Sequence, residues 1–201
     1  MYGAVIEMIN EGWDVNTMKV SDITARAGIG KGTAYEYFSS KEAIITMALG
    51  HDILKKHVQI EKIVDGGGTF EEKTNRIFDY VEEEFGKPQT FCTLVRIGTG
   101  SYEISESIRQ EYKKLQEDIS GISIEFVLDR LMEQGRREGI LSQQNPGLCR
   151  TAFLAQLMAY VAILISEKGW NREVCPVEGC GVSAEEAKRF VYASLVKSLN
   201  E

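Results

Sequence analysis

The sequence is short of cysteine, proline and positive charge, and each shortage argues against a class of protein. Its 201 residues contain four cysteines and three prolines, and the formal net charge is −7. Because no secretory signal opens the chain, we expect the thiols to be reduced rather than paired in a disulfide framework. The negative charge argues against a protein that coats DNA regardless of sequence, since such proteins are usually basic.

Long apolar runs and alternating strand patterns are also missing. The most apolar stretch, residues 152–165, is too short to span a bilayer comfortably and has the length of a buried helix. We therefore expect a cytoplasmic protein with no membrane partner. Apolar residues recur at helical spacing almost everywhere, so the sequence predicts an all-α protein of about nine helices.

Four helix starts carry capping signals. Ser39, Thr69 and Ser183 are each followed three residues later by a glutamate, which is the capping-box pattern. Asn145 precedes Pro146, and proline is favoured in the first turn of a helix. These signals predict helices that begin near residues 40, 70, 146 and 184.

Residues 19–38 predict a helix, a tight turn and a second helix. Residues 28–30, Gly-Ile-Gly, form the turn, and we expect Ile29 to be tucked into the core. Successive residues of a helix are about 100° apart, so Ala34 and Phe38 share one face of the second helix. These two side chains are expected to pack inward.

The opposite face of this second helix is small, hydroxylated and aromatic. Gly32 would let the backbone approach a partner closely, and Thr33 could touch a base edge or a thymine methyl group. Lys31 and the tyrosine hydroxyls suit phosphate. Glu36 could accept a hydrogen bond from a cytosine amine, or lie at the rim of the contact. Such a face suits the major groove of double-stranded DNA.

The stretch VSDITARAGIGKGTAYEYFSSKEAI, residues 20–44, resembles the TetR family of transcriptional regulators. The resemblance implies a helix-turn-helix DNA-binding head of three helices over residues 1–46 and a ligand-binding and dimerisation domain over residues 47–201. Lys19 stands where the family's second helix often has a hydroxyl cap. The implied DNA contacts are Gly30, Lys31, Gly32, Thr33, Tyr35, Glu36, Tyr37 and Lys41, of which Lys41 would contact phosphate.

The same resemblance implies a C-terminal helical bundle that binds a small-molecule effector and pairs with a second subunit. A set of apolar residues could line an effector pocket or serve as plain core: Phe78, Val81, Phe91, Tyr102, Phe126, Phe153 and Tyr160. The last two helices would form a homodimer interface through Leu157, Val161, Ile165, Ala187, Val191 and Leu195. The run of glutamates at 82–84 is expected to be a solvated face.

The resemblance implies a ligand-responsive transcriptional regulator, and the residue patterns of the second helix agree with DNA binding. The resemblance implies a repressor that is released from a near-palindromic operator by its effector. The alternative is a helical protein–protein interaction module without sequence-specific DNA binding. That alternative is favoured by the acidic head, because residues 1–50 hold four lysines and arginines against six aspartates and glutamates.

Motifs for catalysis are not found in the sequence. It contains no phosphate-binding glycine loop, no nucleophile elbow and no paired-histidine motif, so we expect no enzymatic activity, no cofactor and no metal. Cys175 and Cys180 could have a redox or metal-binding role, but ordinary free thiols are the favoured interpretation.

Overall fold

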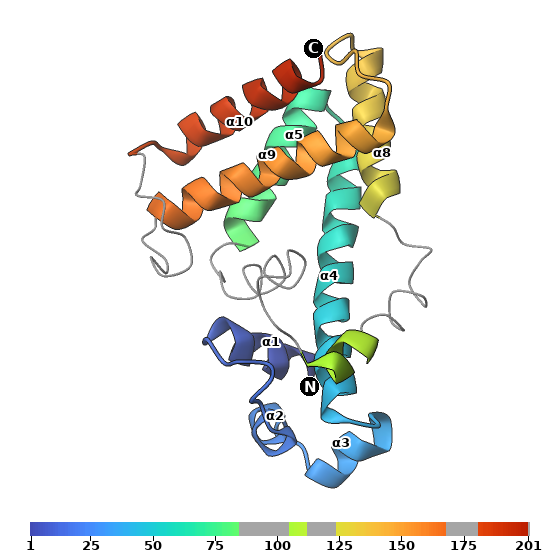
Figure 1. Cartoon of the computed structure of the whole chain (residues 1–201), viewed down its shortest axis with the longest axis vertical. Coiled ribbons are helices and arrows are strands. Elements are labelled where there is room, and N and C mark those ends of the chain that lie inside the picture. The colour runs from blue at the N-terminus through green and yellow to red at the C-terminus, as the bar shows by residue number, and fades with distance from the viewer. Residues whose placement is uncertain (85–104, 112–123, 168–180, 201) are drawn as a thin grey trace. The chain divides into compact units, whose positions relative to one another are not determined.

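The computed structural model describes residues 1–84, 105–111, 124–167 and 181–200. Within these ranges every regular element is a helix, which confirms the predicted fold class. These helices are α1–α5 and α8–α10, labelled in Figure 1, and residues 106–111 form a further helical stretch. The described residues fall into two compact units. One contains residues 1–58 and 105–111, and the other contains residues 59–84, 124–167 and 181–200.

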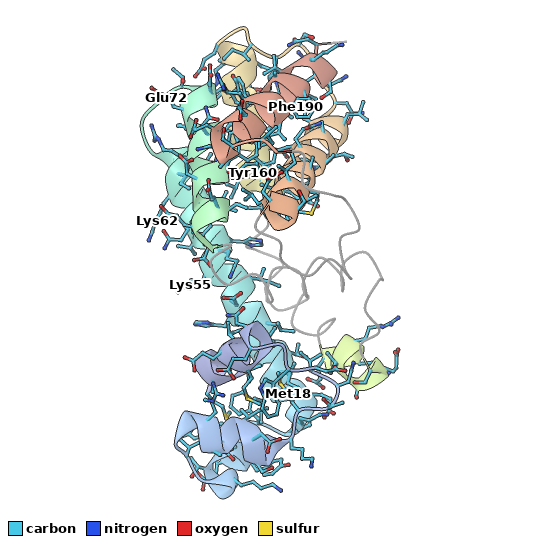
Figure 2. The ribbon with its side chains drawn as sticks, turned by 90° about the vertical axis from the view of Figure 1, so that its left-hand side faces the viewer. Met18, Lys55, Lys62, Glu72, Tyr160 and Phe190 are labelled. Carbon is cyan, nitrogen blue, oxygen red and sulfur yellow. The ribbon has the colours of Figure 1, made fainter. Side chains whose placement is uncertain are left out.

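The first unit is built on α1 (Tyr2–Asn10), α2 (Val20–Ala27), α3 (Lys31–Tyr37) and the start of α4 (Lys41–Asp65). Its helices are short, so packing rather than helix propensity has to stabilise them. Figure 2 shows Met18 pointing in among these helices. Met18 belongs to a buried apolar cluster with Val5, Met8, Ile9, Val15, Val20, Ile23, Ala34, Ile44, Ile45, Ala48, Leu49 and Ile108.

The turn between α2 and α3 has the expected backbone but a different packing. Gly28 ends α2 in the left-handed conformation with φ 66°, where glycine is favoured because it has no Cβ. Ile29 does not enter the core, since its side chain is 37% exposed. Ala34 is fully buried as expected, and Phe38 packs partly buried against the cluster, edge-on to Tyr2 at 5.9 Å.

Three of the four predicted helix starts carry the predicted cap. Thr69 and Ser183 each exchange hydrogen bonds with the glutamate three residues later, and Asn145 Oδ1 accepts from the Leu148 amide at 3.1 Å. At α4 the cap is Ser40 rather than Ser39: Ser40 Oγ accepts from the Ala43 amide at 3.0 Å. Ser39 and Ser40 each carry a hydroxyl that could cap the helix, and the cap is made by Ser40, the residue directly before α4.

The second unit contains the end of α4 with α5 (Phe70–Glu84), α8 (Ile124–Arg137), α9 (Pro146–Glu167) and α10 (Ala184–Ser198). Figure 1 shows α9 and α10 side by side, and α9 also packs against α5 and α8. Aromatic rings fill the centre, where Tyr160 points inward in Figure 2. We call Phe78, Phe153 and Tyr160 the aromatic cluster.

A buried lysine joins three helices of the second unit. Lys73 on α5 is only 7% exposed, and its ammonium donates to the Val64 carbonyl of α4 at 2.7 Å and to Gln134 Oε1 of α8 at 2.8 Å. These bonds offset the cost of burying the charge. Close beside them α8 has no room for a side chain at Gly135, where an added Cβ would lie 2.7 Å from Leu141 Cδ1 and 3.0 Å from Phe70 Cδ2.

Helix α9 is longer than the apolar run in the sequence suggested. Over Pro146–Leu164 it is long and apolar enough to cross a membrane by length and composition alone. The core helix of a soluble protein meets the same criterion. One side of α9 packs within the chain, through Cys149, Phe153, Leu157, Tyr160, Val161 and Leu164.

Candidate nucleic-acid interface

The outward face of α3 is the candidate contact surface. Of the seven residues of α3, only Ala34 is buried, and Gly30 just before the helix is exposed as well. Tyr37 is 77% exposed and Tyr35 is 49% exposed, which is unusual for aromatic side chains in a short helix. The structure therefore presents together, on one helix and its preceding turn, the predicted residues Gly30, Lys31, Gly32, Thr33, Tyr35, Glu36 and Tyr37.

Ala34 and Phe38 fix the orientation of α3. Ala34 packs its methyl group into the core cluster, and its small size lets α3 lie close to α2. Phe38 holds the end of α3 against α1 through Tyr2. Since both anchors lie on one face, the other side chains of the helix are left to solvent.

Lys31 lies at the start of α3 and keeps its charge accessible. Its ammonium is 6.0 Å from the centre of the Tyr35 ring, which is the outer limit of a cation–π contact. The residue is exposed and makes no ion pair with any residue in the described part of the chain. This cation is therefore free to meet a phosphate.

Lys41 is placed differently from the other predicted contacts. It lies on α4, where its ammonium donates to the Asn16 carbonyl at 2.9 Å and is 3.7 Å from Glu42. The side chain is only 25% exposed. In this structure Lys41 ties the first turn of α4 to the loop between α1 and α2.

Arg26, another cation of the head, is also engaged. Its two terminal nitrogens donate to the two carboxylate oxygens of Glu11, each at 2.7 Å, and Glu7 is 3.9 Å away. The hydrogen bond from Arg26 lowers the pKa of Glu11. This fork-to-fork pair holds α2 against the end of α1.

Comparison with known proteins identifies this head. Residues 6–47 match the sequence profile described as bacterial regulatory proteins of the tetR family. The chain carries a TetR-family domain. Over 58 residues it is 31% identical to the HTH-type transcriptional regulator SAR0097 of Staphylococcus aureus strain MRSA252, a match that spans 29% of this chain and about 30% of that relative's length.

Solved structures extend the likeness to the fold of the remaining chain. The transcriptional regulator FadR of Bacillus subtilis, solved with stearoyl-CoA, superimposes with a TM-score of 0.67 over 96% of both chains, at 16% identity. The fatty acid degradation regulator FadR of Bacillus halodurans gives a TM-score of 0.68 over 97% of this chain and 95% of its own, also at 16% identity. At this identity the likeness shows the fold.

The residues predicted for the effector pocket are only partly together. The Phe78 ring stacks on Phe153 with centroids 6.4 Å apart and lies 5.2 Å from Tyr160, and Val81 is buried on the same helix as Phe78. Phe126 does not join them, because its side chain is 66% exposed. Phe91 and Tyr102 lie outside the described residues, as do Cys175 and Cys180.

A polar contact within the aromatic cluster was missed at the level of sequence. The Tyr160 hydroxyl donates to Glu82 Oε2 at 2.9 Å, so one glutamate of the run at 82–84 is not simply solvated. Burial, followed by the bond to this carboxylate, raises the pKa of Tyr160 far above its ordinary value. In the sequence, the only sign of this contact is the spacing of Glu82 from Phe78 and Val81 on α5. That spacing does not show whether the Glu82 side chain points into the unit or out to solvent.

Most of the residues predicted for the dimer interface are buried within the single chain. Five of them are buried inside the single chain, each at most 8% exposed: Leu157, Val161, Ala187, Val191 and Leu195. They pack α9 and α10 onto each other and onto the rest of the unit, so their side chains are largely covered within one chain, and their part in a dimer stays a prediction. The side chain of Ile165 lies outside the described part of the structure.

The apolar residues that α9 and α10 leave exposed lie on other faces. Leu148 is 55%, Leu154 is 43% and Phe190 on α10 is 65% exposed, and Figure 2 shows Phe190 on the outside of its unit. At about 100° per residue, the exposed side of α9 lies opposite its buried side. We call this side the α9 outer face; it comprises the exposed Leu148, Thr151, Leu154 and Ala155 and the half-buried Met158 and Ala162.

Proposed function

We propose that the protein is a homodimeric, ligand-responsive repressor that binds near-palindromic operator DNA in the cytoplasm. The observation that supports it best is the exposure of α3, in which only Ala34 is buried within a domain of TetR type. A helix held by one alanine and one phenylalanine, with tyrosines, threonine and glycine directed to solvent, has no structural need for those residues. Contact with DNA would explain why these residues are present on the exposed face.

The chemistry of α3 suits a major groove. Gly32 lets the backbone approach the bases, and Thr33 offers a hydroxyl and a methyl group to a base edge. Tyr35 and Tyr37 reach phosphate oxygens through their hydroxyls. Glu36 accepts from a cytosine amine and therefore selects for sequence.

Two heads are needed for a palindromic site, and the α9 outer face provides a surface for pairing. Five of its six side chains are apolar, and the hydrophobic effect favours covering such a surface. We propose that this face, with Phe190 of α10, packs on its copy in a second subunit. Dimeric helix-turn-helix proteins of this kind bind half-sites about 34–36 Å apart.

For the effector, a long acyl chain is the first class to test. The B. subtilis FadR structure holds stearoyl-CoA, and the second unit of this chain has a similar fold with an aromatic centre. If the effector lowers the affinity of the protein for its operator, the operator lowers the affinity of the protein for the effector by the same factor.

The first experiment selects duplexes from a random library with the purified protein. We expect a two-fold symmetric site bound by two chains. Sequence-blind binding, or no binding at low salt by an intact dimer, would overturn the proposed function and favour a protein partner for the head.

The second experiment titrates stearoyl-CoA into the operator complex, with coenzyme A alone as the matched control. A loss of operator affinity of about 5–150-fold with the acyl form only is the expected range for allosteric coupling. Equal affinity with and without stearoyl-CoA would rule out this effector while leaving the DNA-binding role intact.

A further inference from the structure

The head has very few cations with which to hold a polyanion. Residues 1–50 contain only Lys19, Arg26, Lys31 and Lys41, against six acidic residues. Neutralisation of phosphates supplies much of the affinity of proteins for DNA, and each contact contributes to the dependence of affinity on salt. Which of the four cations are available therefore decides how the head holds its operator.

Two of the four are already engaged within the head. Arg26 forms the two-pronged pair with Glu11, and Lys41 donates to the Asn16 carbonyl from a side chain that is three-quarters covered. To reach a phosphate, Arg26 would have to leave a carboxylate that pairs with both of its terminal nitrogens. The Lys41 ammonium keeps further donors, but its side chain is three-quarters covered and bonded to the loop between α1 and α2.

The other two are exposed and make no ion pair with any described residue. Lys31 begins α3, and Lys19 is the residue directly before α2. In helix-turn-helix proteins the first helix of the motif crosses the DNA backbone while the second enters the groove. Lys19 thus lies at the N-terminal end of α2, the helix that would cross the phosphate backbone. Its long side chain can extend the ammonium outward.

We propose that Lys19 and Lys31, here called the phosphate pair, supply the positively charged phosphate contacts of the head, and that Lys41 and Arg26 hold the head together instead. The proposal rests on the proposed DNA-binding function. Lys19 makes no ion pair with a described residue, and its ammonium has no acceptor with which to cap the start of α2.

Salt dependence tests the assignment. The slope of log affinity against log salt changes by about 0.9 for each phosphate contact. In a dimer one substitution removes two contacts, so Lys19→Ala and Lys31→Ala should each flatten the slope by about 1.8. The double variant should flatten it by about 3.6.

Three variants serve as controls. Lys41→Gln removes the charge but keeps an amide that can donate to Asn16, and Arg26→Gln likewise keeps a donor for Glu11. Lys55→Ala removes an exposed lysine of α4 that lies about 21 Å along the helix from its start, well beyond the Debye length. All three should keep the wild-type slope, and a thermal melt of each variant checks folding.

The outcomes separate the two proposals. If a symmetric operator is bound but Lys19→Ala keeps the wild-type slope, or Lys41→Gln flattens it as much as Lys31→Ala does, the phosphate pair is wrong while the DNA-binding function stands. If no operator is recovered in the selection, the function itself fails.

Discussion

Gly28 and Gly32 are four residues apart and are glycines for different reasons. Gly28 ends α2 with φ 66°, a conformation that other residues adopt only with strain. Gly32 lies inside α3 with ordinary helical geometry, and an added Cβ would meet nothing within 4 Å. The fold requires the first glycine, whereas only a partner could require the second.

Alanine substitutions at Gly28 and Gly32 distinguish a requirement of the fold from a requirement of DNA binding. Gly28→Ala should lower the free energy of unfolding by about 1–2 kcal/mol. Gly32→Ala should raise it by up to about 1 kcal/mol, because alanine is the better helix former, yet weaken operator binding by filling the space where DNA approaches. Urea denaturation and operator titration measure the two effects. Operator affinity unchanged in Gly32→Ala would contradict close approach of the DNA at that residue.

Glu138 makes the stability of the second unit depend on acid. Its two carboxylate oxygens accept from the Phe70 amide at 3.1 and 2.9 Å, and the donation from this amide lowers the pKa of Glu138 below its ordinary 4.5. A carboxylate with a depressed folded-state pKa stabilises the fold above the unfolded value. That contribution is lost as the pH falls through the folded value.

Glu138→Gln should therefore flatten the acid dependence of stability. We expect the wild type to lose more of its free energy of unfolding between about pH 7 and about pH 3 than the variant loses, because only the wild type takes up this proton on unfolding in acid. Urea titrations of both proteins at the two pH values measure the difference. Parallel losses would mean that Glu138 does not carry this dependence.

At the level of the elements, the helical stretch 106–111 packs against the N-terminal helices of the head, although it is distant from them in sequence. Ile108 is 1% exposed and belongs to the core cluster of the head. Thr46 Oγ1 donates to the Ile108 carbonyl at 3.5 Å, and the Ser105 amide donates to Asn16 Oδ1 at 3.0 Å. The core of the head is thus completed by a side chain some sixty residues further along the chain.

Ile108→Ala should destabilise the head although the residue lies far outside it in sequence. Removing the buried side chain of an isoleucine costs about 2–5 kcal/mol of unfolding free energy. Arg109→Ala, at the exposed neighbouring position, should stay within about 0.5 kcal/mol of wild type. Chemical denaturation followed by circular dichroism measures both, and equal effects would show that the Ile108 side chain does not stabilise the head.

Local elements were predictable because their signals are local. Gly28 at the turn, Ala34 on the inner face of α3, and the caps at Thr69 and Ser183 all follow from residues within four positions of each other. The buried side of α9 was not predictable, because that helix is apolar around most of its circumference and periodicity then has no contrast.

At the scale of the whole molecule the sequence predicted the helical class but not the long-range contacts. Ile108 in the head and the bond between Tyr160 and Glu82 join residues more than sixty positions apart. No spacing rule connects such positions. The burial of the residues predicted for the dimer interface was not foreseen for the same reason. A single sequence does not say which apolar face packs within the chain and which stays exposed to a partner.

Pairing through the α9 outer face gives a test at this scale. Leu154→Glu places a charge on an exposed apolar position, so the chain should fold normally but pair at least about tenfold more weakly. Val191→Glu, on the fully buried side of α10, should instead unfold the second unit. Analytical ultracentrifugation and circular dichroism distinguish these results. A Leu154→Glu protein that remains as dimeric as wild type would exclude this face.

Gly135 limits how this chain can vary. Its Cα faces Leu141 and Phe70 so closely that even a methyl group would displace one of them. In a library of random single substitutions, functional clones should therefore return glycine at this position, although neighbouring positions on the exposed side of α8 accept many residues. Alanine should become acceptable only in clones where residue 141 has also become smaller, so the two positions would drift together rather than separately.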